Sequence, residues 1–440
     1  MKASPSVGAA TAGDSYLPRN GNGGYGVDRY DLDLRYRVAT NRLDGTAIIR
    51  ATSTQVLEKF SLDLSRLRVD KLRIEGQRGA TFRQTANKVT ITPGVVIAAG
   101  AVFTVTIDYS GSPVPRPSAW GAVGWEELND GVIVASQPSG APSWYPCNDD
   151  VADKASYGIR ISTEQDYTVV GTGIQTHHRV SSGRGQWVFE QAEPTASYLV
   201  TLQIGRYVRT PLDLAGVSGA LVYPAHLREG VLADFSQLGA MMEFFQACFG
   251  PYPFSAYTVI VTPDVLEIPL EAQAMAIFGS NHAGGIGLVE RLVAHELAHQ
   301  WFGNSVGLAS WKHIWLNEGF ACYSEWLWSE HQGGPSADAL ARQFRRYLVA
   351  QPTDIILGDP GPALMFDDRV YKRGALTLHA LRLTIGDKPF FELLREWVAT
   401  YRLGVANTDD FRALAARHCE GSLEPLFDEW LFGTSVPRLP

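Results

Sequence analysis

The first half of the chain alternates apolar and polar residues with the period of two that is typical of half-buried strands. In the segment VDRYDLDLRYRV, residues 27–38, one face carries Tyr30, Leu32, Leu34, Tyr36 and Val38. Clusters of Gly, Pro, Asn and Ser separate further short runs at 60–64, 88–92, 103–109, 132–135, 157–161 and 187–189. Many short strands at such spacing predict an all-β sandwich or saddle.

The pattern changes after Gly205. Apolar residues between 234 and 248 recur at helical spacing. Residues 256–261 form a predicted strand, and nearly every segment beyond 285 has helical periodicity. We therefore expect an α+β protein of two domains, with an all-β domain over 1–205 and a mostly α-helical domain over 206–440.

Composition narrows the class of protein. Of the 440 residues, 45% are hydrophobic and 19% are charged, which excludes a mostly disordered chain. No run of about 18 apolar residues predicts a membrane span. The net charge of −8 argues against a nucleic-acid partner held by phosphate contacts.

Cysteine usage and the first residues bear on location. The four cysteines stand far apart and in no CxxC pair, which favours reduced, buried thiols in a cytosolic protein. Residues 1–14 are small and polar and lack the apolar core of a signal peptide. We therefore expect a cytoplasmic protein, or a secreted one if a leader has been removed.

Residues 295–299 read His-Glu-Leu-Ala-His and form the first candidate site. Positions i and i+4 lie on one face of a helix, so His295 and His299 can bind one zinc ion at about 2.0–2.1 Å. Glu296, beside the first ligand, can reach the water on the metal. The five residues alone also fit an ordinary amphipathic helix with surface histidines.

Glu318, in Trp-Leu-Asn-Glu-Gly-Phe-Ala, follows His299 after eighteen intervening residues and opens a predicted helical segment, 320–330. A carboxylate from a second helix would complete a His₂Glu set with one open position, the arrangement of a catalytic zinc site. The alternative is an acidic residue that favours a helix N-terminus. The joint pattern predicts one zinc ion per chain.

Together these residues resemble the aminopeptidase N family of zinc peptidases, the gluzincins that also include leukotriene hydrolase. Gln-Trp-Phe-Gly-Asn at 300–304, Val-Tyr-Lys-Arg-Gly at 370–374 and Tyr-Pro-Cys-Asn-Asp at 145–149 resemble further stretches of that family. The resemblance spans about 30–437. It implies a β saddle followed by a thermolysin-like catalytic domain, in a short form that lacks the family's C-terminal helical domain.

The resemblance implies roles for two catalytic residues. Glu296 would be the general base, and Tyr371 would stabilise the developing oxyanion, with a helix over 375–383 downstream. The alternative for Tyr371 is a packing residue.

The family also has a Gly-x-Met-Glu-Asn segment on an edge strand, whose carboxylate holds the substrate's amino group. Here the segment reads Ile-Pro-Leu-Glu-Ala, 268–272, so only Glu271 is kept. Gln137 matches a glutamine of the same pocket, and Ser139 stands where some members have a second acid. The alternative for Glu271 is a surface strand residue.

Three further residues have weaker support. Glu325 lies two helical turns past Glu318 and could hold a metal-binding histidine, or be a surface charge. Asn317 is expected to be a local hydrogen-bond partner. Glu267 lies four residues before Glu271 on a predicted extended strand, so both would share a face; it would favour Arg or Lys side chains of the substrate, unless it turns to solvent.

We therefore expect a monomeric zinc-dependent aminopeptidase that acts on peptides with a free N-terminus. One alternative is a zinc endopeptidase with an open cleft, against which Glu271 argues. Another is a catalytically weak metal-binding scaffold on the same fold, against which the presence of Glu296 and Tyr371 argues. Nothing in the sequence points to the epoxide hydrolase activity of leukotriene hydrolase.

Overall fold

The computed structural model describes residues 7–287 and 289–440, so residues 1–6 of the polar N-terminal segment lie outside it. The chain forms two compact units. The first contains the chain up to Arg209 with segments 222–225 and 262–265, and the second contains 210–221, 226–261 and 266–440. Because two later segments join the first unit, this division does not decide the predicted boundary at Gly205, which stays a prediction.

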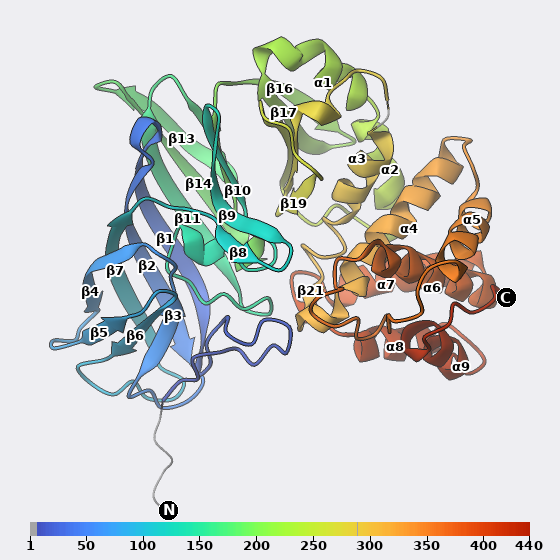
Figure 1. Cartoon of the computed structure of the whole chain (residues 1–440), viewed down its shortest axis with the longest axis horizontal. Coiled ribbons are helices and arrows are strands. Elements are labelled where there is room, and N and C mark those ends of the chain that lie inside the picture. The colour runs from blue at the N-terminus through green and yellow to red at the C-terminus, as the bar shows by residue number, and fades with distance from the viewer. Residues whose placement is uncertain (1–6, 288) are drawn as a thin grey trace, which may run out of the picture. The chain divides into compact units, whose positions relative to one another are not determined.

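A seven-stranded sheet, ordered β13-β14-β11-β1-β2-β7-β4, dominates the first unit (Figure 1). Its strands are β1 (Tyr25–Arg37), β2 (Arg42–Ser53), β4 (Arg68–Ile74), β7 (Val102–Gly111), β11 (Lys154–Glu164), β13 (Ile174–Ser181) and β14 (Arg184–Ala196). β1 pairs antiparallel with β2 and parallel with β11, with Leu32 beside Ala47 and Ile159. The predicted β-rich domain is confirmed.

Two smaller sheets complete this unit. The first is ordered β12-β15-β10-β9-β8 and the second β3-β6-β5. Their strands are β3 (Phe60–Asp63), β5 (Thr81–Gln84), β6 (Lys88–Thr92), β8 (Arg116–Ser118), β9 (Gly121–Leu128), β10 (Gly131–Ala135), β12 (Thr168–Gly171) and β15 (Leu202–Gly205).

The alternation along β1 explains how these sheets pack. Its apolar face, Tyr30, Leu32, Leu34 and Tyr36, is at most 2% exposed and enters one hydrophobic cluster with residues of all three sheets. The ring of Tyr36 meets that of Trp125 on β9 edge to face, with centroids 4.8 Å apart. Burial of aromatic faces on both sides therefore holds the sandwich together.

The second unit has a sheet ordered β16-β17-β18-β20-β19, followed mostly by helices. Its strands are β16 (Tyr207–Leu214), β17 (Val217–Pro224), β18 (Ala256–Val261), β19 (Leu270–Ala272) and β20 (Met275–Phe278), with β21 (Gly307–Leu308) and β22 (Val405–Ala406) in a separate pair. Among the described strands, β19 lies at the edge of this sheet and pairs with β20 alone.

The helices of this unit surround the predicted metal motif. They are α1 (Arg228–Asp234), α2 (Leu238–Phe249), α3 (Glu290–Ala298), α4 (Trp315–His331), α5 (Ala337–Val349), α6 (Asp368–Ile385), α7 (Asp387–Thr400), α8 (Thr408–Ala416) and α9 (Glu424–Phe427). The predicted, mostly α-helical second domain is thus confirmed. Among the described residues, no helix is both long and apolar enough to span a bilayer.

Three predicted helix boundaries were wrong. The helix expected over 234–248 is interrupted between α1 and α2. α4 begins at Trp315, so Glu318 lies inside its first turn instead of opening it. α6 begins at Asp368, because the Asp367 side chain caps it by accepting from the Arg369 amide, and Tyr371 therefore lies on this helix and not before it.

All four cysteines are unpaired. Cys147, Cys248 and Cys322 are buried, and Cys419 is partly exposed. The expectation of free thiols without a disulfide framework is confirmed for the structure.

Helices α4 and α6 touch backbone to backbone at two glycines. A Cβ atom added to Gly374 would lie 2.7 Å from the Cα of Gly319, and one added to Gly319 would lie 2.8 Å from the Cα of Gly374. Neither glycine can accept a side chain unless the helices separate. The contact therefore fixes the spacing between the helix that carries Glu318 and the helix that carries Tyr371.

We predict that Gly374→Ala destabilises the protein. Overpacking costs about 1–3 kcal/mol, which exceeds the gain of about 1 kcal/mol from replacing a helical glycine by alanine. Urea unfolding measures the change. Gly421→Ala is the matched control, because no atom lies within 4 Å of its added Cβ; equal stability of the two variants would contradict the close contact.

Candidate metal and catalytic site

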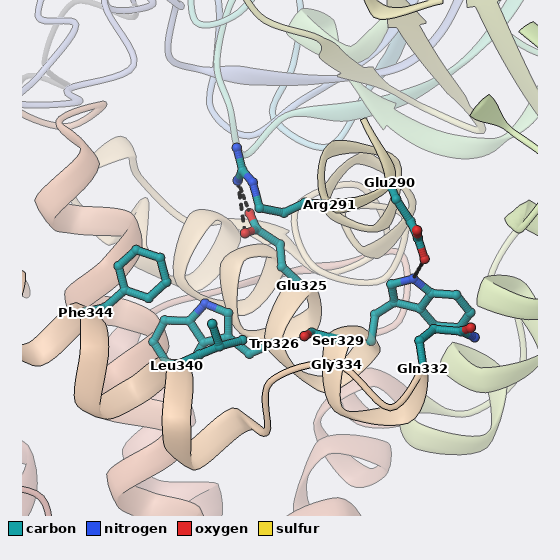
Figure 2. A pocket seen from close by; sticks show the side chains of 10 residues that line it. Glu290, Arg291, Glu325, Trp326, Ser329, Gln332, Gly334, Leu340 and Phe344 are labelled. Carbon is teal, nitrogen blue, oxygen red and sulfur yellow. Dashed lines mark hydrogen bonds and ion pairs between the residues drawn. The ribbon is translucent and has the colours of Figure 1, made fainter. Parts of the chain in front are cut away.

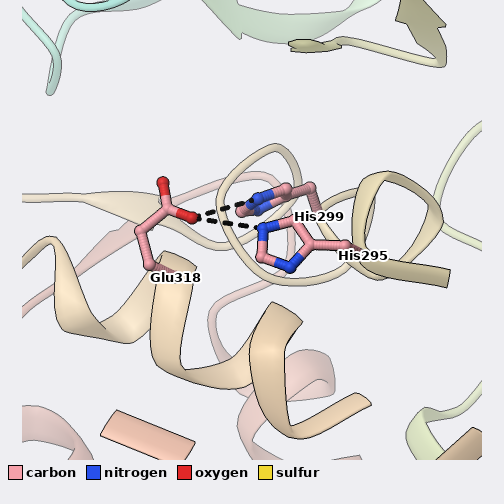
Figure 3. A group of neighbouring side chains, drawn as sticks. All are labelled: His295, His299 and Glu318. Carbon is pink, nitrogen blue, oxygen red and sulfur yellow. Dashed lines mark ion pairs between the residues drawn. The ribbon is translucent and has the colours of Figure 1, made fainter. Parts of the chain in front are cut away.

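The predicted metal ligands converge in the second unit (Figure 3). His295 lies on α3, His299 directly follows that helix, and Glu318 lies on α4. Oε2 of Glu318 is 3.4 Å from Nε2 of His295 and 3.4 Å from Nε2 of His299. All three side chains are buried, so the structure brings together the three residues that the sequence pattern paired.

These distances fit a shared metal ion. Two ligand atoms about 2.0–2.2 Å from one zinc ion lie about 3.3–3.5 Å apart when the geometry is tetrahedral. The two separations of 3.4 Å match that edge length. Two imidazoles and one carboxylate can therefore hold zinc and leave a fourth position open.

The other ring nitrogen of each histidine is already occupied. Nδ1 of His295 lies 2.7 Å from Oε1 of Glu325, and Nδ1 of His299 lies 3.0 Å from the carbonyl oxygen of Phe302. Because a carbonyl only accepts, Nδ1 of His299 carries the proton, which leaves the lone pair on Nε2 for a metal. Burial and the Glu325 contact agree with the predicted role of that residue over the alternative of a surface charge.

Arg291 is a partner of the site that sequence reasoning missed. Its Nη1 lies 3.0 Å from both carboxylate oxygens of Glu325 (Figure 2). It precedes His295 by four residues, so both side chains reach Glu325 from the same face of α3. The i, i+4 spacing of Arg291 and His295 could be read from the sequence. It did not indicate an ion pair, because the sequence does not show that Glu325 of α4 lies opposite this face of α3.

Glu296 lies between the two histidines in sequence and is 4% exposed. Its Oε2 has no hydrogen-bond partner among the described residues. Burial raises the pKa of this carboxyl, against the lowering effect of His295 and His299. An unpaired carboxylate oxygen in a dry site is suited to take up a proton.

Tyr371 lies beside the metal ligands. Its ring stacks on that of His295, with centroids 6.0 Å apart and planes 17° from parallel. Burial is the main cause that raises the pKa of the phenol well above its usual value, so the hydroxyl keeps its proton. A protonated phenol in this position can donate a hydrogen bond.

Glu271, on the edge strand β19, meets the same site. One of its carboxylate oxygens, one of Glu296 and a ring nitrogen of His299 lie within 4.8 Å of one another. Glu271 is 9% exposed, and burial raises the pKa of its carboxyl to about 7, against the lowering effect of His299. The alternative of a surface strand residue is therefore wrong.

The segment after α3 holds β19 in place, which is a second feature that the sequence did not reveal. Nδ2 of Asn304 donates to the Ala272 carbonyl at 2.8 Å, and Nε2 of Gln300 donates to the same oxygen at 3.3 Å. Oε1 of Gln300 accepts from the Ala274 amide at 2.9 Å. The stretch 300–304 resembles a family motif, but a single sequence does not indicate that its side chains bind the backbone of β19.

The structure does not support the predicted positions or contacts of Glu267 and Asn317, and it does not test the role of Gln137. Glu267 is exposed on a bend outside β19, so the expectation that it shares a strand face with Glu271 was wrong: β19 begins only after Pro269, at Leu270. The Asn317 side-chain amide has no hydrogen-bond partner among the described residues, against the expected local bond. Gln137 belongs to the first unit, and its role stays a prediction.

Comparison with family models gives two matches. The peptidase M1 N-terminal domain matches residues 27–199, and the peptidase family M1 domain matches residues 234–430.

Curated relatives are aminopeptidases. A leucyl aminopeptidase of Saccharolobus solfataricus is 22% identical over 438 residues, covering 94% of this chain and 54% of that protein. Human aminopeptidase B is 26% identical over 288 residues, covering 61% and 43%. The chain thus spans about half the length of the curated relatives it matches.

Among solved structures, an M1 zinc metallopeptidase from Deinococcus radiodurans is 30% identical, with a TM-score of 0.90, covering 98% of this chain and 99% of that one. A mutant of it has been solved with a Tyr-Ser-Ala substrate. With both family models matched in order and a relative similar along its whole length, the chain belongs to peptidase family M1.

Proposed function

We propose that the protein is a zinc-dependent aminopeptidase that removes the first residue of peptides with a free N-terminus. The observation that carries this proposal is the position of Glu271. Its buried carboxylate faces Glu296 and His299 but lies outside the set of His295, His299 and Glu318 that fits a metal ion. A carboxylate there suits the ammonium group of a substrate.

Zinc held by His295, His299 and Glu318 would lower the pKa of a water molecule and polarise the scissile carbonyl. Glu296 takes the proton of the attacking water and passes it to the leaving amine. Tyr371 donates its hydroxyl proton in a hydrogen bond to the oxyanion that develops on the carbonyl oxygen. Glu325, fixed by Arg291, keeps the imidazole of His295 oriented towards the metal.

Glu271 determines where the chain is cut. It pairs with the N-terminal ammonium and places the first peptide bond over Glu296, so a blocked N-terminus loses both attraction and alignment. That Gln137 takes part in amine recognition stays a prediction. That Glu267 lines the side-chain pocket stays a prediction, without the strand geometry that supported it.

The proposal also covers the metal content, oligomeric state, location and partners of the protein. We expect one zinc ion per chain, a monomer, a cytoplasmic location, and no nucleic-acid or membrane partner. The relatives' names support peptides as substrates, because they are aminopeptidases. Among the described residues, no contact favours the endopeptidase or scaffold alternative.

We predict that Glu296→Gln keeps zinc and loses turnover. Removal of a general base lowers the rate by about 10²–10⁴-fold, while the three metal ligands are unchanged. Elemental analysis and hydrolysis of leucyl-coumarin measure the two properties. His299→Ala is the contrasting variant, since it removes a ligand and should lose the metal itself. A zinc-loaded Glu296→Gln enzyme of normal activity would refute the assigned base.

For Tyr371→Phe we expect a kcat about 10²–10³-fold lower, the effect of losing one oxyanion donor. KM should change little, because the hydrogen bond forms mainly in the transition state. Steady-state kinetics separate the two constants. A variant with unchanged kcat and raised KM would make Tyr371 part of the pocket wall.

The amine-recognition step is tested by Glu271→Gln. On free leucyl substrates kcat/KM should fall by about 10–100-fold, because a charge-assisted hydrogen bond is lost. Glu243→Gln removes one exposed carboxylate of α2 and should have no effect. The wild-type enzyme should leave N-acetyl-leucyl substrates uncut; efficient cleavage of these would favour the endopeptidase alternative.

A further inference from the structure

A hollow on the surface of the first unit is lined by basic and neutral residues, although the chain as a whole is acidic. Its volume is about 280 Å³, and its lining residues come from strands β1, β11, β14 and β13 of the seven-stranded sheet. These strands are labelled in Figure 1. The residues that line it are Arg35, Ser162, Arg179, Ser181, Arg184, Gly185 and Gln186. Three of the seven are arginines and none is acidic, although the protein carries a net charge of −8.

The strand register builds the hollow. Arg35 on β1 lies beside Ser162 on β11, Ser162 lies opposite Gln186 on β14, and Gln186 lies opposite Arg179 on β13. Ser162 and Gln186 thus lie between the two arginines of this cross-strand row. In the next row, Arg184 lies opposite Ser181.

Arg184 is fixed across the floor of the hollow. Its Nη2 donates to the carbonyl oxygens of Tyr36 and Ser162, each at 2.8 Å, and its Nε is buried without a partner among the described residues. A guanidinium that is held by backbone carbonyls needs no rearrangement to receive an anion.

Two acidic residues adjoin the arginines of the hollow in the strand register: Asp44 lies opposite Arg35, and Glu164 lies opposite Arg184. Within the described residues, no ion pair engages Arg35, Arg179 or Arg184. Glu164 is the nearest acid to Arg184 in the register, but its Oε2 accepts from Thr163 at 2.7 Å and from the Val38 amide at 3.3 Å. Burial is the main cause that lowers the pKa of Arg184; the charges of Arg35 and Arg37 lower it further, against the raising effect of Glu164. An anion in the hollow would relieve this repulsion.

We propose that this hollow binds the phosphoryl groups of a small phosphorylated ligand. Guanidinium forks, two hydroxyls and an amide present many donors in a small volume, which suits an oxyanion with several acceptors. Arg35 also borders a second hollow that Asp33, Asp44, Asp70 and Asp108 line. Arg179 should therefore contribute more to binding than Arg35.

Pyrophosphate is the probe, titrated by calorimetry into the zinc-loaded protein at low ionic strength. One equivalent should bind, and affinity should fall as NaCl is added. Arg179→Gln should weaken binding about tenfold or more, and Arg35→Gln should weaken it less. Arg50→Gln removes the same charge from an exposed position on β2 outside the hollow and should bind like the wild type.

Three controls make the result decisive. Failure of pyrophosphate to bind would overturn the proposal. Binding that is unchanged in the double variant Arg35→Gln/Arg179→Gln would also overturn it, because the anion would then bind elsewhere, for example at the zinc ion. Hexaglutamate that binds more tightly than pyrophosphate and is lost with the same variants would overturn the assignment to phosphoryl groups. ADP identifies the source: equal affinity means that the ligand can be a nucleotide, and absent binding means a free phosphate.

Discussion

Three buried carboxylates, Glu271, Glu296 and Glu318, share one site in the second unit, and this crowding of negative charge is the constraint on which the site depends. Buried charges of one sign are costly unless cations balance them. A divalent metal ion held by the two neutral imidazoles and Glu318 supplies that balance. Arg291 does the same for Glu325, whose carboxylate would otherwise add a fourth uncompensated charge. The metal ion and the arginine that neutralise the buried carboxylates are therefore part of the same group of residues as the proposed catalytic side chains.

Rigid elements keep these groups apart at fixed distances. α3 and its C-cap residue present His295 and His299 on one face, α4 presents Glu318 and Glu325 two turns apart, and the glycine contact sets the distance from α4 to α6. The ring of Tyr371 can stack on His295 only because α6 approaches this closely. The packing of α4 against α6 is thus as much a part of the site as its ligands.

Sequence reasoning succeeded where the chemistry depends on local spacing. His295 and His299 follow from helical periodicity, and the strand pattern of β1 follows from strict alternation. It failed where the outcome depends on caps and tertiary contacts. Asp367 extends α6 back beyond Tyr371, and Pro269 keeps Glu267 off β19. The links from Arg291 to Glu325 and from Gln300 to β19 join elements whose proximity one sequence does not reveal.

The hydrogen bonds that Gln300 and Asn304 donate to β19 bear on which residues this strand can contain. Gln300 and Asn304 bind the carbonyl oxygen of Ala272 and do not contact its side chain through these bonds. Every residue type has that oxygen, so the strand can exchange its side chains and still be held at the same place. Residues 268–272 can therefore differ from the family pattern in their side chains while Gln300 and Asn304 still hold the backbone of β19.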